Sequence, residues 1–301
     1  MGVDHARPPN VQRLRRRTAA AAEPPAVHHK IFPPVSTSPP PLALIFGPFD
    51  PSGSSNLPAD AVTCAQLGGH ALGVLTAIHV QDTASIEAIQ PVAPELIDDQ
   101  ARCLLEDMAV GAMKAGPLYT VESVSTIAQI VADYSTVPFV LHLGSLPDEE
   151  MLAADHDAED LVGSLFELLL PQADVVIADH NLITLWANHG FLSAHGGGSP
   201  AEIVLEYQAK WALITGAPLR PGQRSYQLLG ADKQTRQWPW APPPERVMGT
   251  EGLLGCVVAL ELARGLDVPQ AVEEAIHHTA TLAGRSFQPG MGHRLINRSI
   301  S

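Results

Sequence analysis

Short apolar runs alternate with amphipathic stretches along most of the chain. Short apolar runs bounded by turn residues indicate buried strands, whereas apolar residues that recur every three or four positions indicate helices. The expected strands span residues 42–46, 71–80, 110–114, 138–143, 174–178 and 211–215. The expected helices lie near residues 56–69, 94–108, 118–134, 159–170, 181–186, 201–207, 250–265 and 269–286. This alternation predicts βαβ units and a largely parallel sheet with helices on both faces.

The segments 225–230 and 233–240 are short and polar, and they indicate a hairpin late in the chain. We find no internal repeat and no linker after residue 41, so we expect residues 42–301 to form a single α/β domain. In sheets of this kind, ligands bind in the loops at the carboxyl ends of the strands.

Residues 1–41 differ in composition from the rest of the chain. They hold nine of the 27 prolines and the basic cluster 13–17. Such a segment cannot pack a core, so it predicts a disordered Pro/Arg-rich leader. Because it is rich in arginine, it could also be an organelle transit peptide, although Asp4, Glu23 and the prolines count against that alternative.

Charge and cysteine content restrict the class of protein. The net charge is −14, and residues 42–301 alone hold 12 basic and 30 acidic residues, which argues against a nucleic-acid partner. The sequence contains no run of about 18 apolar residues, which is the length that a membrane-spanning helix requires. Cys64, Cys103 and Cys256 show no C-x-x-C spacing, so we expect buried free thiols and a cytoplasmic protein. The histidines lack metal-ligand spacing, and we expect no zinc site.

The stretch 247–265 carries the most distinctive local pattern. Gly249 and Thr250 stand where a loop turns into a long apolar helix. The backbone N–H groups and the dipole at such a helix start commonly hold a phosphate. Glu251 is a carboxylate placed where that phosphate is expected.

Four segments together resemble a known family. Residues 50–60 (DPSGSSNLPAD) are similar to the signature D-P-S-G-G-A-G-x-Q-A-D, and residues 75–83 (LTAIHVQDT) are similar to V-T-A-L-x-x-Q-N-T. Residues 114–118 (KAGPL) resemble K-I-G-M-L, and residues 249–265 resemble H-G-T-G-C-T-L-S-A with its L-A-x-G tail. These are motifs of the hydroxymethylpyrimidine/phosphomethylpyrimidine kinases of the ribokinase-like superfamily, and the resemblance covers about residues 42–301.

The resemblance implies a ribokinase-like three-layer α/β sandwich. It also implies phosphorylation of a hydroxymethylpyrimidine, or of its monophosphate, in thiamine biosynthesis, with ATP and Mg²⁺ as cofactors. The partner would be this small-molecule pyrimidine, and because relatives of this fold commonly pair, a homodimer is a further expectation.

The same resemblance assigns site residues. Gly47 would form the floor of the pocket, Asp60 would close the substrate loop, and Gln81 would read the edge of the pyrimidine. A buried aminopyrimidine requires an amide that both donates and accepts hydrogen bonds, which suits Gln81. Each has a simpler alternative: Asp60 is well placed as a first-turn helix acid, and Gln81 could be an ordinary loop amide.

The phosphate-binding motif departs from the family pattern. The backbone of Gly249, Thr250 and Gly252 would form the anion hole, but the family's catalytic base falls on Gly252, which has no side chain. Glu251 replaces a glycine there. It could act as a substitute base, as a helix N-terminal acid stabilised by the dipole, or as a carboxylate that fills the anion hole.

Other nucleotide motifs are also altered. The family's D-P-V-M reads HLGS at residues 142–145, and its T-P-N-x-x-E reads DHNLIT at residues 179–184, which keeps Asn181 but puts Thr184 in place of the glutamate. The K-G-G turn reads TGA at residues 215–217. We therefore assign no secure catalytic residue and no metal ligand. A catalytically impaired relative, acting as a pyrimidine-binding or regulatory module, is the alternative function, and a purely structural subunit is a third.

Overall fold

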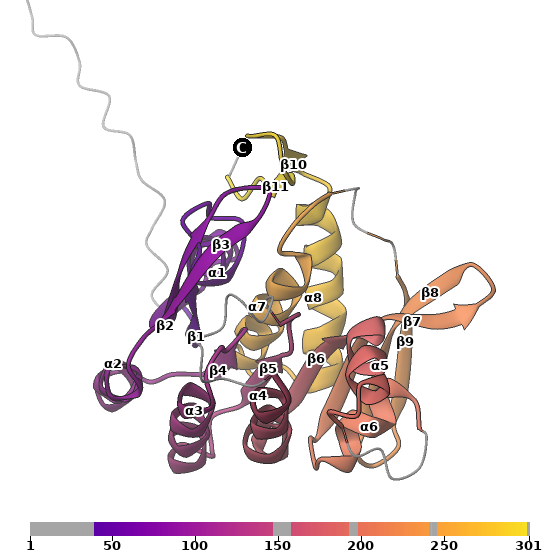
Figure 1. Cartoon of the computed structure of the whole chain (residues 1–301), viewed down its shortest axis with the longest axis horizontal. Coiled ribbons are helices and arrows are strands. Elements are labelled where there is room, and N and C mark those ends of the chain that lie inside the picture. Colours follow the sequence, from indigo (N-terminus) through magenta and orange to yellow (C-terminus); the bar gives the residue numbers. More distant parts are fainter. Residues whose placement is uncertain (1–38, 147–157, 193–197, 241, 243–245, 300–301) are drawn as a thin grey trace, which may run out of the picture. The chain divides into compact units, whose positions relative to one another are not determined.

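The computed structural model describes residues 39–146, 158–192, 198–240, 242 and 246–299, and it contains a nine-stranded sheet between two layers of helices (Figure 1). The strand order is β3-β2-β1-β4-β5-β6-β7-β8-β9. The strands of this sheet are β1 (Leu42–Phe49), β2 (His70–Gln81), β3 (Ile86–Pro91), β4 (Ala112–Ala115), β5 (Phe139–His142), β6 (Val175–Asp179), β7 (Trp211–Arg220), β8 (Gln223–Gly230) and β9 (Thr235–Pro239). All neighbours from β2 to β7 pair parallel, whereas β3, β8 and β9 join antiparallel.

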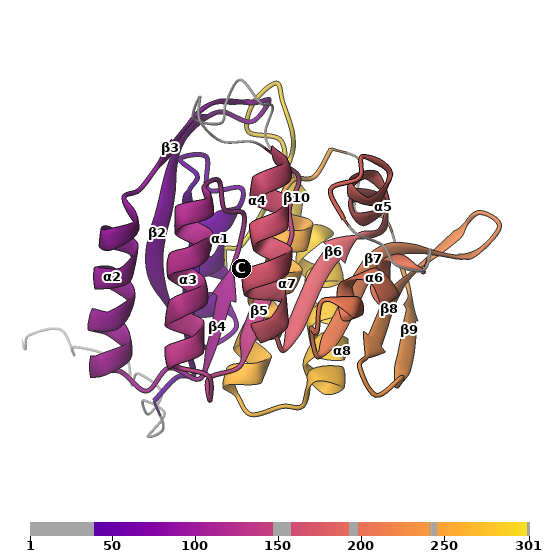
Figure 2. The same cartoon turned by 60° about the horizontal axis from the view of Figure 1, so that its bottom comes forward.

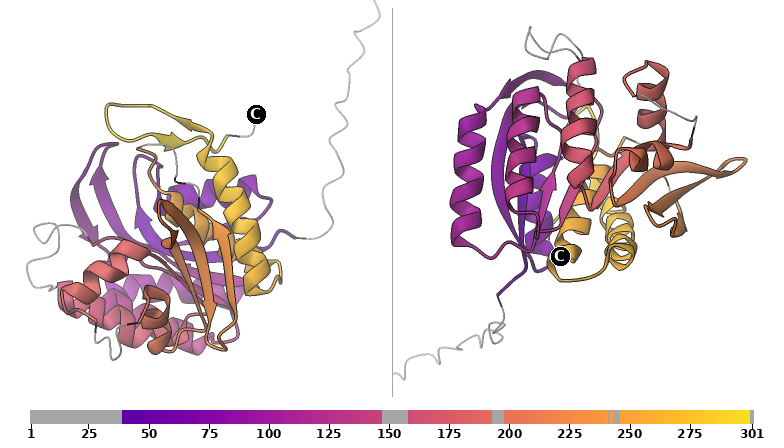
Figure 3. Two further views of the ribbon diagram at one scale, coloured as in Figure 1. Left: turned by 90° about the vertical axis from the view of Figure 1, so that its right-hand side faces the viewer. Right: turned by 90° about the horizontal axis from the view of Figure 1, so that it is seen from below.

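Helices cover both faces of the sheet. They are α1 (Asn56–Gln66), α2 (Pro94–Asp107), α3 (Val121–Asp133), α4 (Ala158–Ser164) with its continuation to Gln172, α5 (His180–Asn188), α6 (Pro200–Glu206), α7 (Thr250–Ala263) and α8 (Val268–Ala283). The buried clusters assign α2 to α6 to one face and α1, α7 and α8 to the other, as Figure 2 and Figure 3 show. The predicted α/β class and its three-layer arrangement are confirmed.

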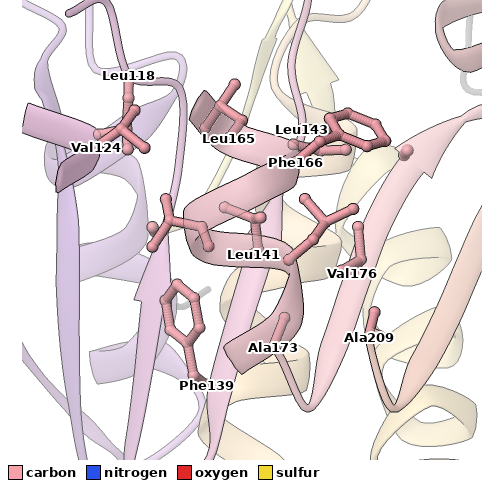
Figure 4. Close-up of a cluster of buried hydrophobic side chains, with 14 of the residues drawn as sticks. Leu118, Val124, Phe139, Leu141, Leu143, Leu165, Phe166, Ala173, Val176 and Ala209 are labelled. Carbon is pink, nitrogen blue, oxygen red and sulfur yellow. The ribbon is translucent and has the colours of Figure 1, made fainter. Parts of the chain in front are cut away.

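Strand β5 shows how side chains are distributed between the two layers. All four of its residues are buried, because parallel strands are covered on both faces. Phe139 and Leu141 pack into the cluster beneath α3 and α4 (Figure 4). Val140 packs on the opposite side with α7. Since side chains alternate along a strand, His142 also faces α7.

The local structure differs from the sequence predictions in three places. Strand β3 was not expected, because its sequence IEAIQP is half-exposed edge sequence with weak periodicity. The expected hairpin exists as β8 and β9, but β7 continues to Arg220 and pairs with β8, so the hairpin extends the main sheet. A separate pair, β10 (Ser286–Phe287) and β11 (Leu295–Ile296), was also not expected.

Buried thiols were predicted correctly at two of three positions. Cys64 and Cys256 are free and buried, with their sulfur atoms 3.6 Å apart. Cys103 is free but exposed, because it lies on the outer side of α2. The prediction for Cys103 was wrong.

Contacts divide the chain into residues Met1–Pro39 and Pro40–Ser301. The predicted leader, residues 1–41, falls almost entirely outside the described residues, and its disorder stays a prediction. Among the helices of the described part of the chain, none is long and apolar enough to cross a membrane.

Candidate active site

Asp50 organises the loop that follows β1. Its carboxylate is fully buried and accepts six hydrogen bonds of 2.6–3.1 Å, from the backbone N–H and the hydroxyl of each of Ser52, Ser54 and Ser55. Burial raises the pKa of Asp50, but these hydrogen bonds outweigh burial and lower it. The loop is thus closed around a carboxylate that stays ionised.

Two residues of this loop adopt left-handed backbone conformations. Gly53 has φ +69°, which a glycine adopts without steric cost. Asn56 has φ +56°, and it stands where the similar signature has its last glycine. Asparagine tolerates this conformation better than most residues, so the change from glycine to Asn56 preserves the path of the loop.

The start of α7 lies directly against this loop. Gly249, the residue before the helix, has φ +77°, and a Cβ atom there would lie 2.4 Å from the carbonyl oxygen of Ser54. Only glycine fits such a close approach. Gly249, Thr250 and Gly252 are therefore adjacent to the loop of Asp50, and the first N–H groups of α7 have no partners within the helix.

Glu251 lies against residues of two strands, β5 and β7. The hydroxyl of Thr215 at β7 donates to its Oε1 at 3.0 Å, and Nε2 of His142 lies 3.8 Å from its Oε2. Burial raises the pKa of the Glu251 carboxyl, but His142 and the Thr215 hydroxyl together lower it. At 3.8 Å, the His142 ring lies beyond hydrogen-bond distance of the Glu251 carboxylate.

His142 is buried beside the first turns of α7. Neither ring nitrogen has a hydrogen-bond partner among the described residues. A Cβ at Gly255 would make ordinary contact with Cβ of His142 at 3.6 Å, but it would lie only 3.2 Å from Cε of Lys114. The sequence drew attention to position 142 only as a departure from the family's strand end.

Asp60 forms a buried ion pair rather than an open contact surface. Its Oδ2 lies 2.5 Å from Nζ of Lys114, and both side chains are almost fully buried. Burial lowers the pKa of Lys114, but Asp60 together with Cys256 and Cys64 outweighs burial and raises it. Direct contact between Asp60 and a substrate stays a prediction; the structure gives this carboxylate the role of anchoring α1 to β4.

Gln81 is half-buried at the end of β2. Its Oε1 lies 2.7 Å from Nδ1 of His79, whose ring packs against Tyr119 at a centroid distance of 5.5 Å. Burial lowers the pKa of His79, although Gln81 and the charge of Asp50 raise it. The amide nitrogen of Gln81 is the part of its side chain left for a ligand.

Gly47 is buried in β1, beside a register shift between β1 and β2. A Cβ atom at Gly47 would make ordinary contact with Leu57 at 3.6 Å. Gly47, Asp60 and Gln81 therefore lie around the loop of Asp50, and their direct contact with a ligand is untested.

A cavity of about 180 Å³ opens beside Glu251 between α7 and α8. Tyr226 and Trp240 form its aromatic walls, and Thr215 and Thr279 contribute hydroxyl groups. The Thr279 hydroxyl is buried and has no partner among the described residues. These groups can receive an aromatic ring that bears hydrogen-bonding atoms.

The model of the family described as "Phosphomethylpyrimidine kinase" matches residues 50–297. The chain belongs to this family. It is 29% identical over 262 residues to the hydroxymethylpyrimidine/phosphomethylpyrimidine kinase of Streptomyces coelicolor, which covers 86% of this chain and 94% of the relative. The corresponding kinase of Mycobacterium leprae is 25% identical over 271 residues, covering 87% and 94%.

Solved structures of related kinases share the fold. Pyridoxal kinase of Staphylococcus aureus in complex with ADP superimposes with a TM-score of 0.73 at 19% identity, covering 87% of this chain and 94% of that one. Phosphomethylpyrimidine kinase of Clostridium difficile superimposes with a TM-score of 0.66 at 19% identity, covering 80% and 98%. The family is one of ATP-dependent small-molecule kinases, which confirms the predicted enzyme class.

Against the family's G-T-G-C motif, the chain lacks a side chain at the position of the base. Gly252 lies in the first turn of α7, and a Cβ atom there would meet no described atom within 4 Å. The space for a base is therefore open, and the nearest carboxylate of the same turn is that of Glu251.

Three residues that sequence reasoning did not single out complete the site. A lysine inside an apolar strand, such as Lys114, signals a buried ion pair, since buried lysines are almost always paired. Arg298 had no such signal: it is buried, and it donates to the Thr63 hydroxyl at 3.0 Å and to the Ser54 carbonyl at 3.3 Å. The sequence motif includes Asp50 as its first residue but does not indicate that its carboxylate organises the loop.

Proposed function

We propose that the chain binds a hydroxymethylpyrimidine, or its monophosphate, and transfers the γ-phosphate of ATP to its hydroxyl group in thiamine biosynthesis. The observation that carries this proposal is the contact between the Ser54 carbonyl and Gly249, which joins the loop of Asp50 to the start of α7. A pyrimidine held by that loop lies next to the N–H groups that receive a phosphate.

Each part of the site has a role in this proposal. The amide of Gln81 reads the edge of the pyrimidine, and Gly47 lies beside the pocket. The N–H groups at Thr250 and Gly252 hold phosphate oxygens during transfer. Asp60, through Lys114, fixes the start of α1 behind the loop.

ATP supplies the phosphoryl group, and Mg²⁺ offsets its charge. Mg²⁺ is usually held by one or two carboxylates together with the phosphates themselves. Asp179 at the end of β6 and Asn181 at the start of α5 are the residues of this chain suited to that role. The start of α7 fits an anion through its backbone, but the Glu251 side chain opposes one.

The two changes in the first turn of α7 predict a slow kinase. General base catalysis typically contributes about 10²–10⁴-fold, and Gly252 offers no base. Two like charges about 4 Å apart repel by roughly 4 kcal/mol at an effective dielectric constant of 20. The Glu251 side chain is 39% exposed, so solvent reduces this repulsion without removing it.

The contact between Glu251 and Thr215 favours a second candidate function. If the Glu251 carboxylate fills the anion hole, the protein would keep its pyrimidine pocket and act as a binding or regulatory module without turnover.

Separate titrations distinguish these functions. Purified protein is titrated by calorimetry with the hydroxymethylpyrimidine and with a non-hydrolysable ATP analogue plus Mg²⁺, and ADP release is then measured with both substrates. Binding of both ligands with turnover supports the kinase, and binding of the pyrimidine alone supports the module. Binding of neither contradicts both.

A Glu251→Gly variant tests the obstruction directly. We expect its affinity for the ATP analogue to rise by about tenfold or more, because a like charge is removed from the anion hole. Unchanged nucleotide affinity would show that Glu251 is only a helix N-terminal acid. Cytoplasmic location and a homodimer remain part of this proposal, and light scattering of the purified protein tests the homodimer.

A further inference from the structure

An open groove of about 1040 Å³ lies between the start of α5 and the ribbon formed by β7 and β8. Figure 1 shows this ribbon projecting beyond the body of the sheet next to α5. His180 and Asn181 line the groove from α5, Arg220 and Arg224 line it from the ribbon, and Trp240 forms a wall. The groove is distinct from the smaller cavity beside Glu251, although Trp240 and Pro242 line both.

The charge of the groove is opposite to that of the protein. Of the described residues that line it, two are arginines and none is Asp or Glu. The chain as a whole carries a net charge of −14. A positive groove in an acidic protein concentrates anions locally, and arginine is the residue best suited to phosphate because its guanidinium presents several N–H donors in a fixed plane.

Arg224 is the more central of the two cations. Its Nη1 lies 3.5 Å from the carbonyl oxygen of Gly216, and its Cζ lies 5.9 Å from the centre of the Trp240 ring. Gly216 has φ +65°, and a Cβ atom there would lie 3.4 Å from Nη1 of Arg224. The guanidinium therefore lies over the turn 215–217, where the family's K-G-G lysine is replaced by Thr215.

Neighbouring groups leave Arg224 able to bind a ligand. The carboxylate of Asp179 lies on the same side of Gly216: its Oδ2 would lie 3.3 Å from a Cβ there, and its Oδ1 already accepts from the N–H groups of Asn181 and Leu182. Asp179 forms no ion pair with Arg224 among the described contacts. Most of the hydrogen-bonding capacity of the guanidinium thus remains open to the groove.

We propose that Arg224 binds the phosphate groups of a nucleoside triphosphate in this groove and supplies from β8 the positive charge that is missing at Thr215. Arg220 adds a second charge on the same ribbon, and Trp240 keeps the guanidinium in place by cation–π contact. This assignment rests on the proposed function, in which ATP is a substrate, and it identifies the positive charge that would hold the ATP phosphates.

The test uses the full-length protein and two probes, inorganic tripolyphosphate and a non-hydrolysable ATP analogue. Binding is measured for the unchanged protein, for Arg224→Gln, for Arg224→Lys and for Arg236→Gln. Arg236 is the matched control, because it lies on β9 outside the groove, its side chain is half exposed, and its nearest ion-pair partner, Glu273, lies 3.9 Å away. Both glutamine variants lower the net charge equally, so a general electrostatic effect would appear in both.

Arg224→Gln should weaken the binding of both probes by about tenfold or more, because a charge-assisted contact to phosphate is lost. Arg224→Lys should recover part of the affinity, Arg236→Gln should change it by less than about twofold, and pyrimidine affinity should be unchanged in every variant. Equal affinities for Arg224→Gln and the unchanged protein would overturn the assignment, and so would an unchanged protein that binds neither probe.

The proposed function can fail separately. If the unchanged protein binds both probes, Arg224→Gln loses them, and no phosphorylated pyrimidine forms, the role of Arg224 stands and the kinase function does not. If the protein phosphorylates the pyrimidine and Arg224→Gln keeps its nucleotide affinity, the kinase function stands and the role of Arg224 is wrong.

Discussion

At the scale of single residues, the first turn of α7 determines what the site can do. Gly249 keeps the glycine that the close approach of Ser54 requires. Glu251 and Gly252 do not keep the chemistry of the family motif: one adds a carboxylate and the other removes the base. Backbone geometry and catalytic chemistry have therefore diverged at neighbouring positions.

Replacement of Gly252 by cysteine should restore a base. A Cβ atom is accommodated there because it meets no described atom within 4 Å. We expect kcat for pyrimidine phosphorylation to rise by about tenfold or more in Gly252→Cys, and its pH profile should show the ionisation of the new thiol.

Gly252→Ala is the matched control for this variant. It adds the same Cβ atom without a thiol, and alanine is favoured over glycine in a helix by about 1 kcal/mol. Thermal unfolding should show both variants to be at least as stable as the unchanged protein. Equal kcat values for the two variants would contradict the idea that the missing base limits turnover.

At the scale of elements, buried charge connects α1 and β4 beneath α7. Lys114 on β4 and Asp60 on α1 form an ion pair, and Gly255 on α7 packs directly over the lysine chain. Strand alternation directs both Lys114 and His142 towards the same helix. The start of α1, which follows the loop of Asp50, is thus fixed by a residue 54 positions away in sequence.

Loss of Lys114 should be strongly destabilising. Lys114→Met leaves the Asp60 carboxylate buried without its counter-charge, which typically costs about 3–5 kcal/mol. Urea unfolding measures the loss, and the double variant Lys114→Met/Asp60→Leu should recover most of it.

Lys210→Met provides the comparison for an exposed pair. Nζ of Lys210 lies 2.6 Å from Oδ1 of Asp174, but the lysine side chain is 64% exposed. The expected cost is about 1 kcal/mol or less. Similar losses for Lys114→Met and Lys210→Met would show that burial of the Lys114–Asp60 pair has no special energetic consequence.

At the scale of the whole molecule, the site lies where several segments that are distant in sequence meet. The loop after β1, the start of α7 and the C-terminal segment meet at Ser54, whose carbonyl contacts Gly249 and accepts from Arg298. In the same C-terminal segment, the N–H of His293 donates to the carbonyl of Thr83 at 2.6 Å. Folding of the whole domain is therefore required to complete the site.

The global stability should fall as the pH drops below about 6.5. Burial holds the pKa of folded His79 below its ordinary value of 6.5. Between these two pKa values the unfolded chain binds a proton that the folded protein does not, so the free energy of unfolding decreases by up to about 1.4 kcal/mol per pH unit for this residue. The effect levels off below the folded pKa, where both states are protonated.

Urea unfolding at pH 7.5, 6.5 and 5.5 checks this expectation. His79→Asn removes the titrating group, so the difference between the two proteins isolates His79 from the other histidines. The unchanged protein should lose more stability than His79→Asn over this range. Parallel pH profiles would mean that His79 does not titrate abnormally.

The sequence by itself determined the layered α/β architecture and the position of the two loops that meet at the site. Hydrophobic periodicity and apolar runs are properties of short segments, so they predicted β1, β2 and α7 without knowledge of the fold. The glycine that begins α7 and the D-P-S-G segment could likewise be read as loop geometry. Edge strand β3 escaped because a half-exposed strand loses the apolar pattern on which such prediction depends.

Only the tertiary structure decided which side chains those loops meet. Lys114 and Asp60, Thr215 and Glu251, and Arg298 and Ser54 are paired across long stretches of chain, and no local pattern encodes the partner. Such pairs arise because a buried charge or carbonyl must find its complement among whatever the packed elements bring near. The sequence thus defined the fold and the motif, whereas packing determined the electrostatics of the site.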